Sequence, residues 1–460
     1  MINNDLSDTI AAVSTPVGVG GIGIVRISGK GALNIADKIF ISPDGKKPSA
    51  FKTYTTHYGA IARQSKIIDE VILTVMRGPK SYTREDIVEI NCHGGIVALR
   101  EALELVLESG ARLACPGEFT KRAFLNGRID LTQAEAVLDI IRAKTDSALK
   151  LGVEQLKGSL SNEINKYRES LLGVLAQLEA GIDFPQEEVP REDPKAISEN
   201  LAAVEKGLGK LIAGSRLARI LREGIHVVIC GKPNVGKSSL LNALLKEERS
   251  IVTPVAGTTR DAIEEIIDIK GIPVRIVDTA GILEPRDLVE KKAVARSRKH
   301  IASADLVIIL FDASKRLSKE DTFLINKLKK KKVIALVNKS DLKQKIERVR
   351  LAKIFRSVID ISAKKMININ LLENAIADLV YSGHIASREP LMAVSLRHTD
   401  IIRRAKIIIA RARESLDNSL PPEFIAQDIK EALDYLDEIS GKKFSEDLLD
   451  KIFSEFCIGK

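Results

Sequence analysis

A glycine-rich segment near the middle of the chain constrains the fold more than any other feature. It reads Gly231-Lys-Pro-Asn-Val-Gly-Lys237-Ser238 and matches the G-x-x-x-x-G-K-[ST] pattern at every fixed position. An apolar run over residues 225–230 precedes it, and a helical pattern over residues 238–245 follows it. In this strand–loop–helix context, backbone N–H groups and the helix N-terminus bind phosphate oxygens. The segment therefore predicts a phosphate-binding loop (P-loop) in an α/β domain.

The residues of the P-loop have separate expected roles. Lys237 would reach the outer phosphates of a nucleotide, and the Ser238 hydroxyl would bind Mg²⁺. The amide oxygen of Asn234 could bind a monovalent cation that adds positive charge beside the phosphates. The residues alone favour this interpretation no more than a second one, in which Asn234 only shapes the loop. The expected nucleotide contacts of this segment are Asn234, Val235, Gly236, Lys237, Ser238 and Ser239.

Four further segments follow in the order that small GTPases show. Thr259 offers a second hydroxyl for Mg²⁺, and Asp278 ends a strand-like run over residues 274–277. Apolar runs over residues 306–311 and 333–337 predict two more strands. The carboxylate of Asp341 could accept hydrogen bonds from N1–H and the 2-amino group of guanine, which adenine does not offer in that arrangement. The expected GTP contacts of these segments are Gly257, Thr258, Thr259, Asp278, Thr279, Ala280, Gly281, Asn338, Lys339, Asp341, Ser362, Ala363 and Lys364.

The group that activates water for hydrolysis is not a glutamine in this chain. Many GTPases carry glutamine directly after the Asp-x-x-Gly motif, whereas Ile282 stands there. Isoleucine can neither orient nor deprotonate water, so another group must act. The same segment offers three carboxylates, those of Glu284, Asp287 and Glu290.

The composition is that of a globular protein of several domains. The 460 residues are 45% hydrophobic and 29% charged, and the four cysteines show no C-x-x-C spacing. No apolar run approaches the roughly 18 residues of a membrane-spanning helix, and the first residues lack a signal-peptide pattern. We therefore expect a cytoplasmic protein without a membrane segment. The net charge of +9 permits a polyanionic partner, while an aromatic content of 4% argues against a base-stacking platform.

Three regions of different pattern follow one another along the chain. Strand-like runs alternate with short helical patterns over residues 1–120, and apolar residues recur at helical spacing over residues 121–221 and 383–460. The GTPase motifs lie between the two helical regions, over residues 222–382. We expect a multidomain α/β protein with an N-terminal α+β domain, a helical domain and a Ras-like P-loop GTPase domain (G domain) inserted into the helical domain.

Segments outside the GTPase motifs carry a family resemblance. The chain ends in Phe456-Cys-Ile-Gly-Lys460 and contains Pro116-Gly-Glu-Phe-Thr-Lys-Arg122 and Asp130-Leu-Thr-Gln-Ala-Glu-Ala136. With the inserted GTPase, these segments resemble the tRNA modification GTPase family MnmE, also called TrmE, over the full length. The resemblance implies a homodimer whose N-terminal domain binds a 5-formyl- or methylene-tetrahydrofolate. It also implies a heterotetramer with an MnmG-type partner that uses FAD and NADH.

The implied activity is K⁺-dependent GTP hydrolysis coupled to tRNA modification. With its partner, such a protein adds a carboxymethylaminomethyl or aminomethyl group at C5 of the wobble uridine of certain tRNAs. The resemblance implies that Glu290 is the catalytic carboxylate and that the loop over residues 253–258 completes a K⁺ site. The implied K⁺ ligands are Asn234, Thr253, Val255 and Thr258, Pro254 and Ala256 join the GTP contacts, and Ser238 and Thr259 fit the Mg²⁺ ligands.

The implied folate pocket falls on Arg26, Glu89, Arg128 and the terminal Lys460. Family members often have lysine where this chain has Arg128, which keeps the charge and changes its geometry. They also often have arginine at Val19, so the folate contacts depart from the family pattern more than the GTP contacts do.

Two other functions remain open at this point. A ribosome-assembly GTPase that docks on ribosomal RNA would show similar motifs, together with a G-x-x-G loop in an RNA-binding domain after the GTPase. The only such spacing lies at residues 18–23, near the start of the chain. A folate enzyme acting alone would need a separate redox partner, because no dinucleotide fingerprint is visible.

Overall fold

The chain forms two compact units, built from segments that are far apart in the sequence. The first unit combines Met1–Leu138, Ser161–Glu169 and Lys430–Lys460, and the second combines Asp139–Leu160 and Ser170–Ile429. None of the helices in the parts described is both long and apolar enough to cross a membrane. The structure is a computed structural model, and it describes residues 8–183, 193–247, 264–278, 300–329, 331–381, 392 and 394–460.

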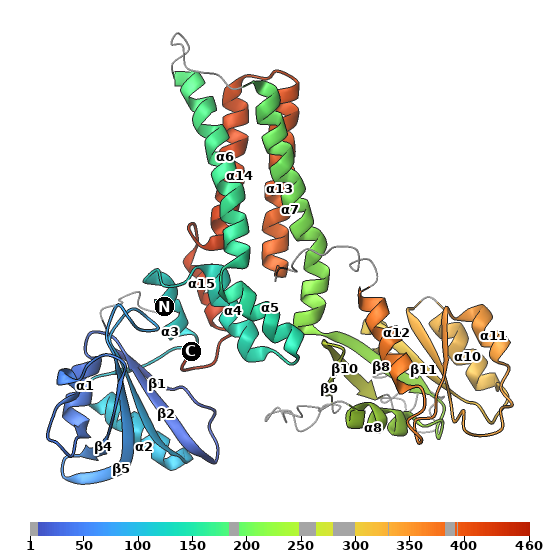
Figure 1. Ribbon diagram of the computed structural model, residues 1–460, viewed down its shortest axis with the longest axis horizontal. Helices are drawn as coiled ribbons and strands as arrows, with labels where there is room; N and C mark the ends of the chain where they lie inside the picture. Colours follow the sequence, from blue (N-terminus) through green and yellow to red (C-terminus); the bar gives the residue numbers. More distant parts are fainter. Residues whose placement is uncertain are drawn as a thin grey trace. The chain divides into compact units, whose positions relative to one another are not determined.

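A seven-stranded sheet forms the centre of the first unit (Figure 1). Its strand order is β3-β4-β5-β6-β2-β1-β7, and all neighbours are antiparallel except β1 and β7, which are parallel. Successive residues of a strand point to opposite faces, so Val25 and Ile27 are buried in the core while Arg26 lies on the other face. The strands are β1 (Ile10–Val13), β2 (Gly20–Ser28), β3 (Phe40–Ile41), β4 (Thr55–Arg63), β5 (Lys66–Met76), β6 (Ile87–Gly94) and β7 (Arg112–Leu113).

Helices α1 (Ala32–Ile39) and α2 (Ile96–Glu108) cover the buried face of this sheet. Buried side chains of both helices, such as those of Ile35 and Leu99, share one apolar cluster with Val25, Leu73 and Ile90. The short helix η1 (Pro48–Ala50) packs against α1. The sequence predicted strands that alternate with short helices over residues 1–120, and the structure shows this alternation from β1 to α2.

The C-terminal helix of the chain returns to the N-terminal part of the first unit. Helix α15 (Glu446–Phe453) packs against α3 (Glu118–Leu125). The rings of Phe124 and Phe453 and the side chain of Leu131 belong to one buried cluster, which also includes Phe456. This packing holds the last four residues of the chain close to β1 and β2. Three helices contribute residues to both units: α4 (Leu131–Arg142), α6 (Ser159–Asp183) and α14 (Pro422–Ser440).

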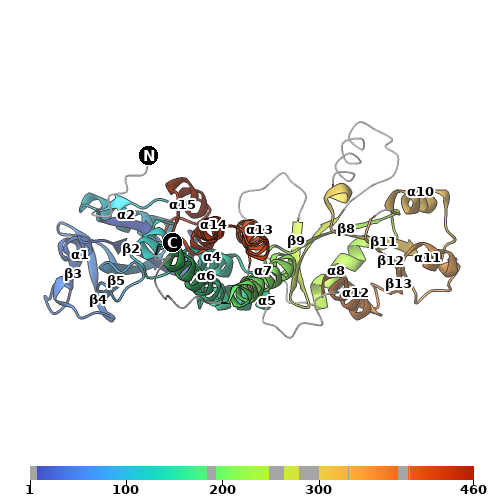
Figure 2. The same ribbon diagram turned by 90° about the horizontal axis from the view of Figure 1, so that it is seen from above.

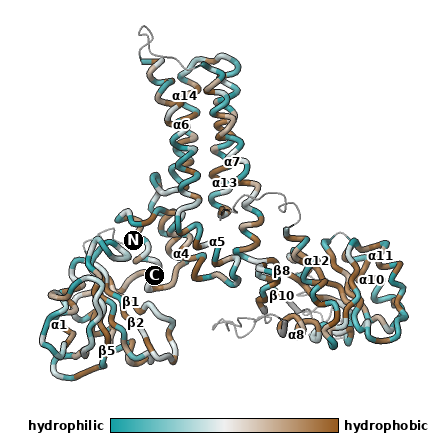
Figure 3. The backbone as a smooth tube through the Cα atoms, in the orientation of Figure 1, coloured by the Kyte–Doolittle hydropathy of each residue, from teal (hydrophilic) through white to brown (hydrophobic). Residues whose placement is uncertain are grey.

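Long amphipathic helices lead into and out of the G domain in the second unit. Helix α7 (Pro194–Glu223) packs along α13 (Leu396–Asp417), and α5 (Asp146–Leu156) packs against α7. Apolar and polar residues alternate along both long helices (Figure 3), and the buried residues recur at three- and four-residue steps. Gly224 ends α7 with φ of +84°, and a Cβ there would lie 2.4 Å from the Pro273 carbonyl oxygen. Glycine therefore allows the chain to turn directly from α7 into the first strand of the G domain.

A six-stranded sheet forms the centre of the G domain, in the order β13-β12-β11-β8-β10-β9. All neighbours are parallel except β9 and β10, which are antiparallel. The apolar runs at residues 225–230, 306–311 and 333–337 form β8, β11 and β12, as predicted. The strands are β8 (Ile225–Gly231), β9 (Glu264–Ile269), β10 (Ile272–Asp278), β11 (Leu306–Asp312), β12 (Val333–Asn338) and β13 (Ser357–Asp360).

Helices cover both faces of the G-domain sheet (Figure 2). One face packs against α8 (Lys237–Glu247), α12 (Ile369–Tyr381) and the end of α7, through a cluster that contains Leu240 and Leu372. The other face packs against α10 (Lys319–Leu328) and α11 (Arg348–Ile354), through a cluster that contains Leu324 and Leu351. Parallel strands covered on both faces explain why their sequences read as continuous apolar runs. Ligands of such sheets bind outside the carboxyl ends of the strands.

Candidate functional site

The P-loop connects β8 to α8 with three residues in the left-handed region. Gly231 has φ of +150°, Gly236 has φ of +102° and Asn234 has φ of +63°. A Cβ on Gly236 would lie 2.2 Å from Nδ2 of Asn338, and a Cβ on Gly231 would lie 2.7 Å from the Leu310 carbonyl oxygen. Only glycine avoids both contacts, so the two fixed glycines of the motif let the loop close onto the ends of β11 and β12.

Lys237 lies across the P-loop. Its Nζ donates hydrogen bonds to the carbonyl oxygens of Gly231, at 3.0 Å, and Lys232, at 2.9 Å. Ser238 and Ser239 are exposed in the first turn of α8, where the helix dipole favours negative charge, and Val235 is buried under the loop. A lysine ammonium, the N–H groups of a helix N-terminus and an exposed hydroxyl therefore meet at one place. Together they can bind phosphate and a hard cation.

Asn338, at the end of β12, is 3% exposed and joins two loops. Its Nδ2 donates to the Val235 carbonyl oxygen at 2.8 Å, and its Oδ1 accepts from the Ala363 N–H at 3.0 Å. The side chain thus links the P-loop to the segment that contains Ser362, Ala363 and Lys364. Both hydrogen-bonding ends of Asn338 are used within the protein, so its main effect on a nucleotide is to hold these loops in place.

Lys339 is the second residue that ties this loop to the P-loop. Its backbone has φ of +64°, and its Nζ donates to the Asn234 carbonyl oxygen at 2.9 Å. The same ammonium lies 2.6 Å from Oδ2 of Asp312, which is 5% exposed. Burial alone would raise the pKa of Asp312, but the bonds from Lys339 and Ser314 lower it, so this carboxylate stays charged.

Asp341, the residue predicted to contact guanine, carries an ionised carboxylate beside Ser362. Its Oδ1 accepts from the Ser362 hydroxyl at 2.7 Å, and its side chain is 15% exposed. The Ser362 hydroxyl lowers the pKa of Asp341, and the charges of Lys365 and Lys364 act in the same direction. A carboxylate that remains ionised can accept from two neighbouring N–H groups of a base.

Several predicted residues have no described surroundings. Asp278 is the last residue of β10, and nothing more is described of it. The predictions outside the described residues are Thr253, Pro254, Val255, Ala256, Gly257, Thr258, Thr259, Thr279, Ala280, Gly281 and Glu290.

A second cluster of predicted residues lies in the first unit, where the C-terminus of the chain meets β2 and β6. The Nε of Arg26 lies 2.8 Å from Oε1 of Glu89, and its Nη1 donates to the Gly459 carbonyl oxygen at 3.2 Å. The same carbonyl accepts from the Ser14 hydroxyl at 3.2 Å. Burial and the nearby charge of Arg26 lower the pKa of Lys460, and Glu89 partly opposes this. The structure therefore brings Arg26, Glu89 and Lys460 together from three distant segments.

Arg128, the fourth residue predicted here, stacks on a tyrosine near this cluster. Its guanidinium carbon lies 4.9 Å from the centre of the Tyr82 ring, and its Nη1 donates to the Tyr82 carbonyl oxygen at 3.3 Å. Burial raises the pKa of Tyr82, while the positive charges of Arg128 and Arg26 oppose the rise. The cluster therefore combines three cationic side chains with the Glu89 carboxylate and the Tyr82 phenol.

Sequence reasoning missed two polar partners of the nucleotide site. Asp312 carries a recognisable signal, because it is a carboxylate at the carboxyl end of a buried strand. Asp321 pairs with Lys232 of the P-loop at 2.6 Å and closes a capping box with Ser318. The Ser-x-x-Asp spacing predicts a helix start at Ser318. Nothing in the sequence indicates that this helix start contacts the P-loop.

The sheet order, the P-loop and the Asn-Lys-x-Asp loop together define a P-loop GTPase domain. A family model described as the MnmE helical domain matches residues 131–457, and one described as the GTP-binding protein TrmE N-terminus matches residues 9–128. The chain belongs to the MnmE family of tRNA modification GTPases.

The similarity to curated relatives extends over the whole chain. The chain is 48% identical over 457 residues to the tRNA modification GTPase MnmE of Clostridioides difficile, with 99% of this chain and 100% of that protein covered. It is 46% identical over 460 residues to the protein of that name from Desulforamulus reducens, again with 99% and 100% covered. The match to Bacillus licheniformis MnmE is 46% over 458 residues, with 98% and 100% covered.

Proposed function

We propose that this chain is a K⁺-dependent GTPase that modifies tRNA together with an MnmG-type partner carrying FAD and using NADH. The pair would add a carboxymethylaminomethyl or aminomethyl group at C5 of the wobble uridine of certain tRNAs. The observation that carries the proposal is the full-length match to tRNA modification GTPases, in both the N-terminal and the helical family models. The charged residues around the P-loop support GTP binding, and the cluster of Arg26, Glu89 and Lys460 supports folate binding.

The G domain would bind GTP with the P-loop amides, Lys237 and Asp341. The exposed hydroxyl of Ser238 fits a Mg²⁺ ligand, with Thr259 as the second. The exposed Asn234, in the left-handed region, fits a K⁺ ligand, with Thr253, Val255 and Thr258 as the others. Bound K⁺ would supply positive charge where a phosphate bond breaks. Glu290 would orient the attacking water, because Ile282 cannot do so.

The cluster around Arg26 would bind the tetrahydrofolate. Folates carry carboxylates and a ring with N–H donors, so they need both cations and an acceptor. Arg26, Arg128 and Lys460 offer the cations, Glu89 offers the acceptor, and the Tyr82 ring offers a flat apolar surface. The folate supplies the one-carbon unit when bound, and these residues would hold it in place.

We further propose a homodimer in the cytoplasm, built through the N-terminal domain. Tyr58 and Ile72 are neighbours on β4 and β5, and their side chains are 60% and 49% exposed. Exposed apolar side chains on one sheet face support a protein contact there. The proposed domains are residues 1–120 for folate and dimerisation, 121–221 with 383–460 for the helical domain, and 222–382 for the G domain.

Mass spectrometry of tRNA nucleosides tests this proposal. A strain that lacks the protein should lose the C5-modified wobble uridine. Wild type should restore it, and Lys237→Ala should not, because the P-loop ammonium is needed for GTP binding. An unchanged nucleoside profile in the deletion strain would leave a GTPase of another function, with ribosome assembly as the next candidate.

A further inference from the structure

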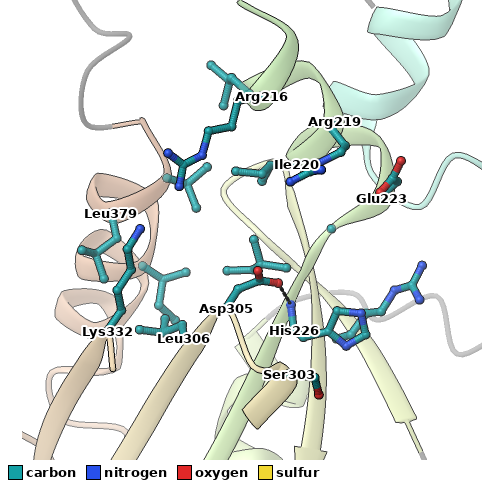
Figure 4. Close-up of a pocket in the computed structure, with 16 residues that line it drawn as sticks. Arg216, Arg219, Ile220, Glu223, His226, Ser303, Asp305, Leu306, Lys332 and Leu379 are labelled. Carbon is teal, nitrogen blue, oxygen red and sulfur yellow. Dashed lines mark hydrogen bonds between the residues drawn. The ribbon is translucent and has the colours of Figure 1, made fainter. Parts of the chain in front are cut away.

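A cavity of about 630 Å³ lies at the edge of the G-domain sheet opposite the P-loop (Figure 4). It is lined by residues at the starts of β8 and β11, such as Ile225 and Leu306, whereas the P-loop follows the end of β8. The end of α7 and the last turns of α12 complete the lining. Starts and ends of parallel strands lie at opposite edges of a sheet, so this cavity is separate from the GTP site.

Basic side chains from two elements surround the cavity. Arg216 and Arg219 come from the last two turns of α7, and Lys332 directly precedes β12. Figure 4 shows the nitrogen atoms of all three directed into the space, over the apolar side chains of Ile220 and Leu379. All three basic residues are exposed, so a large ligand can reach them.

The positive charge of this cluster is not neutralised within the described parts of the chain. There, Arg216, Arg219 and Lys332 make no ion pair and no side-chain hydrogen bond. Neighbouring basic residues differ in this respect. Arg222, for example, pairs with Glu223 at 3.1 Å and with Asp139 at 3.4 Å. Glu223 is one of the two carboxylates that line the cavity.

Two further charged residues line the cavity, Asp305 and Arg275. Asp305 accepts a hydrogen bond from the His226 N–H at 2.9 Å and is the only described lining carboxylate besides Glu223. Arg275 also lines the cavity, and its Nε is buried without a hydrogen-bond partner among the described residues. Four cations thus face two carboxylates, one of which is already paired with a cation outside the lining.

The exposed arginine and lysine side chains of this lining favour a phosphate ligand. Guanidinium groups bind phosphate oxygens through paired N–H donors, and two arginines one turn apart suit successive phosphates. None of the 16 lining residues is Phe, Tyr or Trp, so His226 is the one aromatic side chain of the lining and the cavity offers no large ring for base stacking. Contacts of this kind read the backbone of a nucleic acid and not its sequence.

We propose that the basic cavity formed by Arg216, Arg219, Arg275 and Lys332 binds the phosphate backbone of the tRNA substrate. This inference rests on the proposed function for the presence of tRNA and goes beyond it by naming the contact site. The overall charge of +9 favours a polyanion, and the exposure of the three unpaired side chains favours a chain of phosphates over an enclosed small anion.

Equilibrium binding of an unmodified tRNA transcript to the full-length protein tests the inference. The variant Arg216→Ala/Arg219→Ala/Lys332→Ala removes three charges. The matched control, Arg350→Ala/Lys353→Ala/Arg356→Ala, removes the same charges from exposed positions on and after α11. Both variants should hydrolyse GTP at the basal rate of wild type.

The cavity variant should bind tRNA at least about tenfold more weakly between about 50 and 200 mM salt, with a log–log salt slope reduced by about two to three. The control should keep the slope of wild type. Equal affinity of the cavity variant and wild type, an equal loss in both variants, or no measurable binding by wild type would each overturn the inference.

If wild type restores the modified uridine in cells while the cavity variant binds tRNA normally, only this inference fails. If wild type does not restore it, the proposed function fails.

Discussion

Asn338 contacts Val235 of the P-loop, which lies 103 residues earlier in the chain. Its two hydrogen bonds, to Val235 and from Ala363, hold the P-loop and the segment over residues 362–364 at fixed positions. Gly236 must lack a side chain because this amide lies so close to it. At the scale of single residues, the nucleotide site therefore depends on groups that support the loops as much as on groups that would touch GTP.

Asp341 provides a direct test of base reading. An Asp341→Asn variant replaces an acceptor with an amide that can also donate, so it should bind GTP about tenfold to hundredfold more weakly. The same amide should gain affinity for xanthosine triphosphate, which presents a carbonyl where guanine presents its amino group.

Equilibrium titration with both nucleotides measures this change. A Ser362→Ala variant serves as the control, because it removes the hydroxyl that supports Asp341 and should keep the preference for guanine. Unchanged GTP affinity in Asp341→Asn would mean that this carboxylate does not read the base.

Arg122 is the largest fully buried side chain of the first unit and lies among three carboxylates. Its Nη1 lies 3.1 Å from Glu85, its Nη2 lies 3.1 Å from Glu118, and it also pairs with Asp8. A buried cation of this kind requires its carboxylates to remain ionised.

Glu118 should make the first unit sensitive to acid. Burial alone would raise the pKa of its carboxyl, but hydrogen bonds from Arg112 and the Cys115 N–H lower it below its ordinary 4.5. Because the folded state has the lower pKa, the stabilisation is complete above about pH 4.5 and is lost as the pH falls through the folded value.

Thermal unfolding measured from about pH 7 to pH 3 checks this sign. The melting temperature of wild type should fall more steeply with acid than that of Glu118→Gln, which cannot titrate at this position. Parallel curves would show that Glu118 contributes nothing to the acid sensitivity.

Helix α10 supports the P-loop at the scale of secondary-structure elements. Lys232 of the loop contacts two residues at the start of α10: its Nζ lies 2.6 Å from Oδ2 of Asp321 and 3.0 Å from the Ser318 hydroxyl. Asp321 is 3% exposed and also closes the capping box of the helix. The position of the P-loop is therefore tied to the first turn of a helix that follows it by about eighty residues.

Breaking this link should weaken nucleotide binding without removing any expected GTP contact. Lys232→Met removes the cation beside the buried Asp321 carboxylate, which keeps only its hydrogen bonds from Ser318, and should destabilise the G domain by about 3 kcal/mol. Asp321→Asn keeps an acceptor for the cap and should cost less.

A double-mutant cycle of these two substitutions, read by nucleotide affinity and by melting temperature, measures the link. A coupling free energy of about 1 kcal/mol or more is expected for groups in contact. Additive effects of the two substitutions would show that the pair does not act as a unit.

At the scale of the whole molecule, the apolar patterns of the sequence predicted many of the helices and strands. They did not predict which distant segments contact one another. Continuous apolar runs predicted β8, β11 and β12, because parallel strands are buried on both faces. The two-residue strand β7 could not be predicted, since only its pairing with β1 defines it. The residue types of the nucleotide site were predictable from their motifs, whereas the pairing of Lys232 with Asp321 depends on packing.

The cluster of Arg26, Glu89 and Lys460 also depends on contacts between distant segments that the sequence does not predict. Neither Arg26 nor Glu89 stands out in the sequence, because charged residues on strands are usually solvated. The family resemblance singled them out, and the folded chain brings Arg26 within hydrogen-bonding distance of both Glu89 and Gly459. The cavity at the opposite edge of the G-domain sheet had no sequence signal, because its cations come from three separate segments between Arg216 and Lys332.

The rate of GTP hydrolysis by the purified full-length chain, in K⁺ and in Na⁺, tests the central claim most directly. The account predicts hydrolysis about tenfold or more faster in K⁺, loss of that advantage in Asn234→Ala, and no loss in Asn370→Ala, an exposed asparagine on α12. Equal rates of wild type in the two salts, or a wild-type rate of Asn234→Ala in K⁺, would contradict the account.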